Sequence, residues 1–297
     1  MHFKKFLNNL YFYMFQINWK LKALLYKIFD ALKLKGTFYL IQKYITKRSK
    51  VKINKIDKSW RFHSENIKKK KIGKILEIGA GKSLAQNIYI SYNFNNSIKQ
   101  TVIDINEMLD FKLFNEASKQ VSDLLNLKNR GLVENLEQLK QLYNIDYKAP
   151  MKVEELEENE NKYDMCISTT ALEHFSVLDL KNYLKQLKKI LSGKTLISSA
   201  IDYSDHYSHT DSSISPLNYL KFTELEWKKY NNSYLFQNRL RHQDYKKVFS
   251  EMDFEILEVE KGPFLEKPNF ISKDFDYTDE ETFVGWAFFL IKTKEFS

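Results

Sequence analysis

The sequence has too few cysteines for disulfide bonds and lacks the long apolar runs of membrane-spanning helices. It has one cysteine, Cys166, which excludes an internal disulfide framework and fits a reducing compartment such as the cytoplasm. It has no run of 18 clean apolar residues, so we expect no transmembrane helix. Lys4 and Lys5 precede an apolar stretch at 10–19, but no small-residue cleavage site follows, which argues against a signal peptide.

Charge is unevenly spread along the 297 residues. Residues 1–71 carry 19 Lys/Arg against 3 Asp/Glu, a net charge of +16, whereas the remainder carries 28 against 35, a net charge of −7. Residues 3–34 lack proline and glycine, and Leu24 and Ile28 belong to an apolar set at helical spacing. The pattern predicts a basic, helical N-terminal extension over residues 1–71. Its terminal lysine run at 68–71 is most simply a solvated linker.

Three partners fit this extension. It packs on the main domain or on a second subunit, it lies through residues 1–35 on an anionic membrane surface, or it binds nucleic acid. Lysines interleaved with apolar residues are typical of an amphipathic helix at a membrane, while phosphate neutralisation is the physical basis of the nucleic-acid alternative. The sequence alone leaves all three open.

From residue 72 onward, short apolar runs alternate with helical stretches, which predicts an α/β fold with a mainly parallel sheet. The expected strands are 74–79, 100–105, 142–147, 164–168, 194–201, 254–260 and 284–294. Two regions are longer than a minimal unit needs, and we expect helical insertions at about 106–140 and 202–240. Long segments at strand ends of such sheets tend to build substrate sites.

The stretch "EIGAGKS" at 77–83 ends like a nucleoside-triphosphate loop. Such a loop requires a glycine five residues before Gly81, where this chain has Leu76, and the Glu77 carboxylate would repel phosphates. Its first part instead fits a strand, an acid and a Gly-x-Gly turn, followed about 25 residues later by Asp104 at the end of a second strand. A carboxylate there can accept both hydroxyls of a ribose.

Three segments then carry a family resemblance. "ILEIGAG" (75–81), "VIDI" (102–105) and "YDMCISTTALEHF" (163–175) resemble motifs of class I S-adenosylmethionine-dependent methyltransferases, in the same order over 72–294. The resemblance implies a methyltransferase domain at 72–297, with a Rossmann-like, seven-stranded, mostly parallel sheet whose last strand is antiparallel. The stretches at 201–209 and 222–245 further resemble a bacterial group associated with surface-polysaccharide biosynthesis.

The resemblance also implies a donor site for S-adenosylmethionine. Glu77, Gly79 and Gly81 would hold the methionine part of the donor, and Asp104 would hold its ribose. Asp146 and Tyr147 would lie on the adenine side, while Ser168 and Thr169 would line the wall of the pocket. Ser83 replaces a glycine that the family often has. Asp146 reads equally well as an exposed strand-end acid, and Glu173 with His174 as a structural pair.

The acceptor side is expected after the fifth strand, in "DYSDHYSHTD" at 202–211. We predict His206 as general base with Asp205 or Asp202 as its orienting acid. The alternatives are a polar loop whose side chains cap turns, or a divalent-metal site, although the spacing matches no specific metal motif and we expect none.

Other side chains of the insertion are candidates for holding the acceptor. Arg239 and Arg241 could bind an anionic acceptor group or form ordinary salt bridges. Trp60 and Trp227 could stack on a sugar ring or close a lid.

We therefore expect a cytoplasmic enzyme, located at the inner membrane surface if the extension binds lipid. It would methylate a hydroxyl, or alternatively an amine, of a saccharide or of another small or lipid-linked acceptor. A nucleic-acid methyltransferase is the first alternative, weakened by the acidic body and by the absence of an Asn/Asp-Pro-Pro-aromatic motif. A non-catalytic binding protein that retains the fold is the second.

Overall fold

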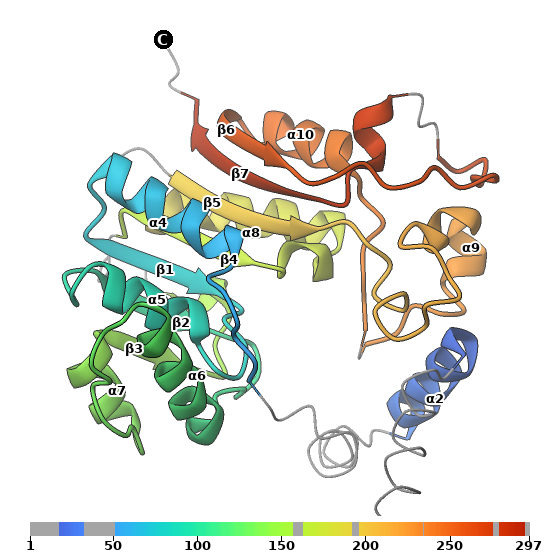
Figure 1. Ribbon diagram of the computed structural model, residues 1–297. Coiled ribbons are helices and arrows are strands. Elements are labelled where there is room, and N and C mark those ends of the chain that lie inside the picture. Colours follow the sequence, from blue (N-terminus) through green and yellow to red (C-terminus); the bar gives the residue numbers. More distant parts are fainter. Residues whose placement is uncertain are drawn as a thin grey trace, which may run out of the picture.

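A seven-stranded sheet forms the centre of the molecule (Figure 1). The structure is a computed structural model, and it describes residues 18–32, 51–156, 163–191, 196–233, 235–275 and 279–294. The strands are β1 (Lys74–Ile78), β2 (Lys99–Ile103), β3 (Ile145–Lys148), β4 (Met165–Thr169), β5 (Leu196–Asp202), β6 (Phe254–Lys261) and β7 (Trp286–Thr293). Their order is β3-β2-β1-β4-β5-β7-β6, and β7 runs antiparallel to both neighbours. The predicted Rossmann-like sheet with an antiparallel last strand is confirmed.

Alternating residues send their side chains to opposite faces of the sheet, and helices cover both faces. Ile75 and Ile167 pack with α4 (Lys58–Lys70), whereas Leu76 and Cys166 pack with α8 (Val177–Ile190) and α10 (His242–Glu251). A third cluster joins β2 and β3 to the remaining sheet-covering helices, which are α5 (Ala85–Asn93), α6 (Phe111–Leu124) and α7 (Leu136–Tyr143). Because both faces of the sheet are buried, the strands are apolar on both sides.

The third strand begins later than the sequence predicts. Leu142 and Tyr143 end α7, and Asn144 closes that helix in a left-handed conformation with φ 54° before β3 begins at Ile145. Asparagine tolerates this conformation better than most residues, so it stops helices readily. The predicted strand 142–147 therefore merged the apolar end of a helix with the true strand.

The basic stretch before residue 72 contains a helix that belongs to the sheet. Phe62 and Ile67 of α4 are buried against β1, β4 and β7. Asp57 caps its N-terminus by accepting from the backbone N–H of Ser59 at 2.8 Å. The lysine run at 68–71 is exposed, as expected, but it forms the last turn and C-cap of this helix instead of a linker.

The N-terminal extension packs on the second predicted insertion. α2 (Trp19–Ala31) buries Trp19 and Ala23 in a cluster with Tyr207 and Trp227, and the backbone N–H of Trp19 donates to Asp211 at 2.9 Å. Within the predicted helical extension, α2 and α4 are helices, while residues 1–17 and 33–50 lie outside the described residues. Across the described part of the chain, no helix has the length and apolarity to cross a bilayer.

The two predicted insertions differ in structure. Residues 106–140 contain α6 and most of α7. Residues 202–240 are mainly loop, with the short turns η3 (Asn218–Lys221) and α9 (Glu224–Trp227). The remaining short 3₁₀ turns are η1 (Val153–Glu155), η2 (Leu172–His174) and η4 (Glu280–Phe283).

Candidate active site

The glycine turn between β1 and α5 has the backbone that only glycine adopts freely. Gly79 and Gly81 have φ values of +76° and +72°. A Cβ on Gly79 would lie 3.3 Å from the Cβ of Ala171, whereas a Cβ on Gly81 would meet no heavy atom within 4 Å. Gly81 therefore borders open space at the carboxyl end of β1, where a ligand can approach the backbone closely.

Glu77 is buried at the end of β1 and is tied to the following helix. Its carboxylate accepts from Asn87 Nδ2 at 2.6 Å and from Gln86 Nε2 at 3.0 Å. Burial raises the pKa of Glu77 to about 7, although both hydrogen bonds oppose the shift. The acid thus fixes the first turn of α5 against the sheet, and its predicted contact with a donor molecule stays a prediction.

A chain of polar contacts continues from Glu77 to α4. The hydroxyl of Thr169 donates to Gln86 Oε1 at 2.8 Å and lies 3.0 Å from His63 Nε2. Burial lowers the pKa of His63 to about 3, so its ring is neutral. His63 and Gln86 escaped the sequence analysis. Polar side chains in the turn after the glycines were the available signal for Gln86.

Ser168 is the other β4 residue predicted to line the donor pocket, and its side chain contacts the neighbouring strand. Ser168 is fully buried and donates to the hydroxyl of Ser199 on β5 at 3.0 Å. Its side chain therefore links neighbouring strands, and only its backbone could face a ligand.

Asp104 lies at the carboxyl end of β2, as predicted, and is half-buried. Burial raises its pKa, while a hydrogen bond of 3.1 Å from the backbone N–H of Asn106 opposes the shift. The buried Tyr147 holds the loop beyond Asp104, because its hydroxyl accepts from the backbone N–H of Met108 at 2.9 Å and of Leu109 at 3.2 Å. This loop therefore has a fixed shape next to the glycine turn.

Asp146 precedes Tyr147 on β3 and points the opposite way, because strand residues alternate. It is half-exposed, and its Oδ2 lies 3.8 Å from Lys148 Nζ. The two residues predicted together on the adenine side therefore lie on different faces of the sheet.

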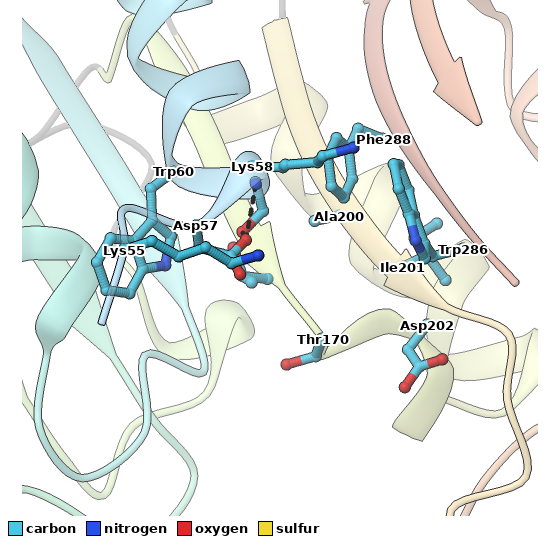
Figure 2. Close-up of a pocket in the computed structure, with 12 residues that line it drawn as sticks. Lys55, Asp57, Lys58, Trp60, Thr170, Ala200, Ile201, Asp202, Trp286 and Phe288 are labelled. Carbon is cyan, nitrogen blue, oxygen red and sulfur yellow. Dashed lines mark hydrogen bonds between the residues drawn. The ribbon is translucent and has the colours of Figure 1, made fainter. Parts of the chain in front are cut away.

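A cavity of about 450 Å³ opens at the carboxyl ends of β4 and β5. Figure 2 shows Trp60 and Trp286 on opposite sides of it, with Thr170 and Asp202 at its lower edge. Residues 55–60 form one wall, so the segment before α4 and its first turn contribute directly to the site. Trp227 is instead buried in the cluster beneath α2.

The predicted acid/base cluster is partly assembled. Asp202 Oδ2 lies 3.8 Å from His206 Nε2 and 3.5 Å from His209 Nε2. Asp205 is buried elsewhere and accepts from the backbone N–H of Tyr207 at 2.9 Å and from Asn218 Nδ2 at 3.0 Å. Of the two candidate acids, Asp202 is thus the one placed beside His206.

His206 has the protonation state that a base requires. Burial lowers its pKa to about 4, and the neighbouring His174 lowers it further, while Asp202 acts in the opposite direction. The imidazole is therefore neutral at pH 7 and can accept a proton.

Both predicted acceptor-binding arginines are engaged within the protein. Arg241 is fully buried and donates to the carbonyls of Tyr203, Thr282 and Val284 and to a tyrosine hydroxyl. Arg239 forms a 2.6 Å ion pair with Glu224. Arg241 thus contacts the segment that precedes β7, whereas Arg239 links parts of the insertion to one another, and a role in holding the acceptor stays a prediction.

Comparison with known proteins gives structural likeness only. No protein-family model matches the chain, and no curated protein matches it. Among solved structures, it is similar to a 1,6-didemethyltoxoflavin-N1-methyltransferase from Burkholderia thailandensis bound to S-adenosylhomocysteine. The identity is 12%, 89% of each chain is covered, and the TM-score is 0.49.

Two further structures show the same kind of likeness. The magnesium protoporphyrin IX methyltransferase of Synechocystis PCC 6803, also with bound S-adenosylhomocysteine, is 11% identical, with 93% of this chain and 100% of that chain covered and a TM-score of 0.41. The CurJ carbon methyltransferase is 17% identical, with 75% of this chain but 48% of that chain covered and a TM-score of 0.41. At these scores, no residue role, substrate or partner follows from the likeness.

Proposed function

We propose that this chain is an S-adenosylmethionine-dependent methyltransferase. The observation that supports the donor site most directly is the left-handed backbone of Gly79 and Gly81, with open space beside Gly81, next to the strand end that carries Asp104. Open space in front of Gly81 fits a ligand that approaches the backbone, and a half-exposed carboxylate fits a pair of ribose hydroxyls. When bound, the donor would supply an electrophilic methyl group.

The remaining donor-side residues would act mainly by positioning. Glu77 holds the start of α5, and Tyr147 holds the loop beyond Asp104, so the turn and the carboxylate keep a fixed spacing. A preformed site lowers the entropic cost of aligning two reactants, which is the main contribution a protein makes to such a transfer.

We propose a saccharide hydroxyl, free or lipid-linked, as the acceptor. The cavity at β4 and β5 combines flat aromatic surfaces from Trp60 and Trp286 with polar groups such as Asp57 and Asp202. Sugar rings offer apolar faces for stacking and hydroxyls for hydrogen bonding, so this lining suits them. The neutral His206, beside Asp202, would take the proton that the attacking hydroxyl loses.

We further propose that residues 1–35 contact an anionic membrane surface. α2 packs through one face only, and its other face exposes an apolar stripe that includes Leu24 at 55% and Ile28 at 45%. Residues 1–71 around it are strongly basic. Apolar side chains that enter the headgroup region and lysines that pair with lipid phosphates support such a contact. Co-sedimentation with phosphatidylglycerol vesicles, weakened in Leu24→Asp/Ile28→Asp, tests it.

Calorimetric titration with S-adenosylhomocysteine tests the proposed function. We expect one binding site in the full chain and affinity at least tenfold weaker in Asp104→Ala. The exposed Asp123→Ala on α6 serves as a matched carboxylate control with unchanged affinity. Absence of binding by the wild type would refute the donor assignment, and equal affinity in Asp104→Ala would refute the ribose contact.

Two other outcomes would redirect the proposal. Donor binding without methyl transfer to any glycan fraction of a cell extract would favour a non-catalytic protein. Salt-dependent binding of RNA or DNA, with methyl incorporation into it, would favour the nucleic-acid alternative, which the basic segment at 1–71 keeps physically reasonable.

A further inference from the structure

Three metal-ligand side chains meet next to the acid/base cluster. They are Glu173 and His174, on the η2 turn after β4, and His206, on the loop after β5. One ligand atom from each of the three lies within 4.8 Å of the others. Since β4 and β5 are adjacent and parallel, their carboxyl ends bring these two loops to the same edge of the sheet. We call this set the Glu173–His174–His206 group.

Glu173 is the unusual member of the group. Its residue is 1% exposed, and neither carboxylate oxygen accepts a regular hydrogen bond. The backbone N–H groups of Glu173 itself and of Asp202 lie near it and stabilise the charge weakly, while burial raises its pKa well above the ordinary value. A buried carboxylate costs free energy unless it is protonated or meets a cation. This carboxylate therefore lacks a partner that a metal ion would supply.

A backbone hydrogen bond orients His174 in the way that is common for metal ligands. Its Nδ1 lies 2.6 Å from the carbonyl oxygen of Phe236. A carbonyl can only accept, so Nδ1 is the donor, which leaves Nε2 as the ring nitrogen that can face an ion. Histidine ligands of metals commonly donate their other ring N–H to a backbone carbonyl in this way. His174 is also exposed, so an ion can enter from solvent.

His206 supplies the second imidazole, and an anionic shell lies behind it. Its ring centroid is 5.0 Å from that of His174. Asp202, 3.8 Å away through Oδ2, is itself fixed through Oδ1 by the backbone N–H and the hydroxyl of Ser204, at 2.8 and 2.7 Å. The positive charge of Lys22, on α2, disfavours a cation at this place. The negative charge that favours a cation comes from Glu173 and Asp202.

We propose that the Glu173–His174–His206 group binds a divalent transition-metal ion such as Zn²⁺ through two imidazole nitrogens and one carboxylate oxygen. Metal–ligand bonds of about 2.0–2.1 Å place two ligands at most about 4.2 Å apart, so small side-chain rotations would close the 4.8 Å group around an ion. Three protein ligands leave a coordination position open, which is typical of catalytic sites.

The role of this ion rests on the proposed function. A metal at this edge would lower the pKa of an acceptor hydroxyl that binds to it. In that state His206 is a ligand, and Asp202 is the neighbouring group left to receive the proton.

Metal binding can be measured without any methyl acceptor. The full chain is titrated with Co²⁺, whose visible absorption reports coordination, and with Zn²⁺ by calorimetry. We expect one ion per chain, and binding at least tenfold weaker in Glu173→Gln, His174→Asn and His206→Asn. Asp123→Asn is the control, because it removes an exposed carboxylate on α6, outside the group, and it should bind as the wild type does.

The same samples are titrated with S-adenosylhomocysteine, so that a failure of the metal site and a failure of the donor site are separately visible. His174→Asn removes an exposed side chain and is the variant least expected to disturb folding. Absence of Co²⁺ and Zn²⁺ binding by the folded wild type, or binding unchanged in His174→Asn and His206→Asn, would overturn the proposal whatever the donor titration shows.

Discussion

His63 Nε2 lies 3.0 Å from the hydroxyl of Thr169, across 106 positions of sequence. The same hydroxyl donates to Gln86, which in turn donates to Glu77. His63 Nδ1 lies 2.7 Å from the hydroxyl of Ser198 on β5. A helix from the basic N-terminal stretch is thereby connected to the acid that precedes the glycine turn. The position of α4 and the shape of the proposed donor site are consequently linked through one buried polar chain.

Replacing His63 by leucine should lower the free energy of unfolding by about 1–3 kcal/mol, because the hydroxyl of Ser198 loses a buried partner. Urea unfolding at pH 7.5 measures the difference. Arg61→Leu, on the exposed face of the same helix, should change stability by less than about 0.5 kcal/mol.

The effect of this histidine should also depend on pH. The folded-state pKa of His63 is about 3, against 6.5 for the ordinary side chain, so below pH 6.5 the unfolded chain takes up a proton that the folded chain excludes. The wild type should thus lose stability as the pH falls from 6.5 toward 3, and its advantage over His63→Leu should shrink. A difference that stays constant between pH 7.5 and pH 5 would contradict the neutral, buried ring.

Gly81→Ala should weaken S-adenosylhomocysteine binding at least tenfold, because the new methyl group would occupy the space that a ligand needs in front of the turn. Gly131→Ala is a matched control: φ is +102° there, and a Cβ likewise meets nothing within 4 Å. Both variants should lose about 1–2 kcal/mol of stability from the left-handed backbone. Equal donor affinity in the two variants would argue against a ligand at Gly81.

Arg241→Lys should be strongly destabilising, by about 2–4 kcal/mol, because a lysine cannot reproduce the planar fork that satisfies the carbonyls of Thr282 and Val284. Thermal unfolding checks this. The exposed Arg61→Lys should leave the melting temperature nearly unchanged. A stable Arg241→Lys with weakened acceptor binding would instead support the role in holding the acceptor that the sequence suggested.

The imidazole of His206 should titrate with a pKa of about 4 in the metal-free protein, because burial and the neighbouring His174 both disfavour the imidazolium. Asp202 stabilises the charged ring, so Asp202→Asn should lower this pKa further. Proton–carbon NMR of labelled histidine, with His206→Asn to assign the signal, provides the measurement. A midpoint near 6.5 would show that the ring is solvated.

Much of the fold could be predicted because the strands are short, apolar on both faces and separated by clear turns. Local pattern failed where two elements meet without a change in hydrophobicity, as at Tyr143 and Ile145, where a left-handed Asn144 makes the boundary. It also failed at α4, whose terminal lysines suggest a solvated linker although Phe62 and Ile67 are buried.

Parts of the candidate site could likewise be predicted from the sequence, and other parts could not. The glycine turn and Asp104 sit at strand ends and could be located from spacing alone, since parallel strands bring their carboxyl ends to one edge. The carbonyl partners of Arg241 at Thr282 and Val284 come from another loop, and so does the carbonyl that accepts from His174. Such contacts depend on tertiary packing, for which the sequence carries no local signal.

The wall that residues 55–60 contribute to the cavity has a consequence for how this protein could diversify. The residues proposed to hold the donor lie on β1, β3 and β4 or directly after β1 and β2, whereas Trp60 and Asp57 reach the cavity from a segment that precedes all of them. Substitutions in that short segment could reshape the acceptor side while the glycine turn stays intact. Exchanging residues 55–60 between homologous chains is therefore a direct route to altered acceptor preference.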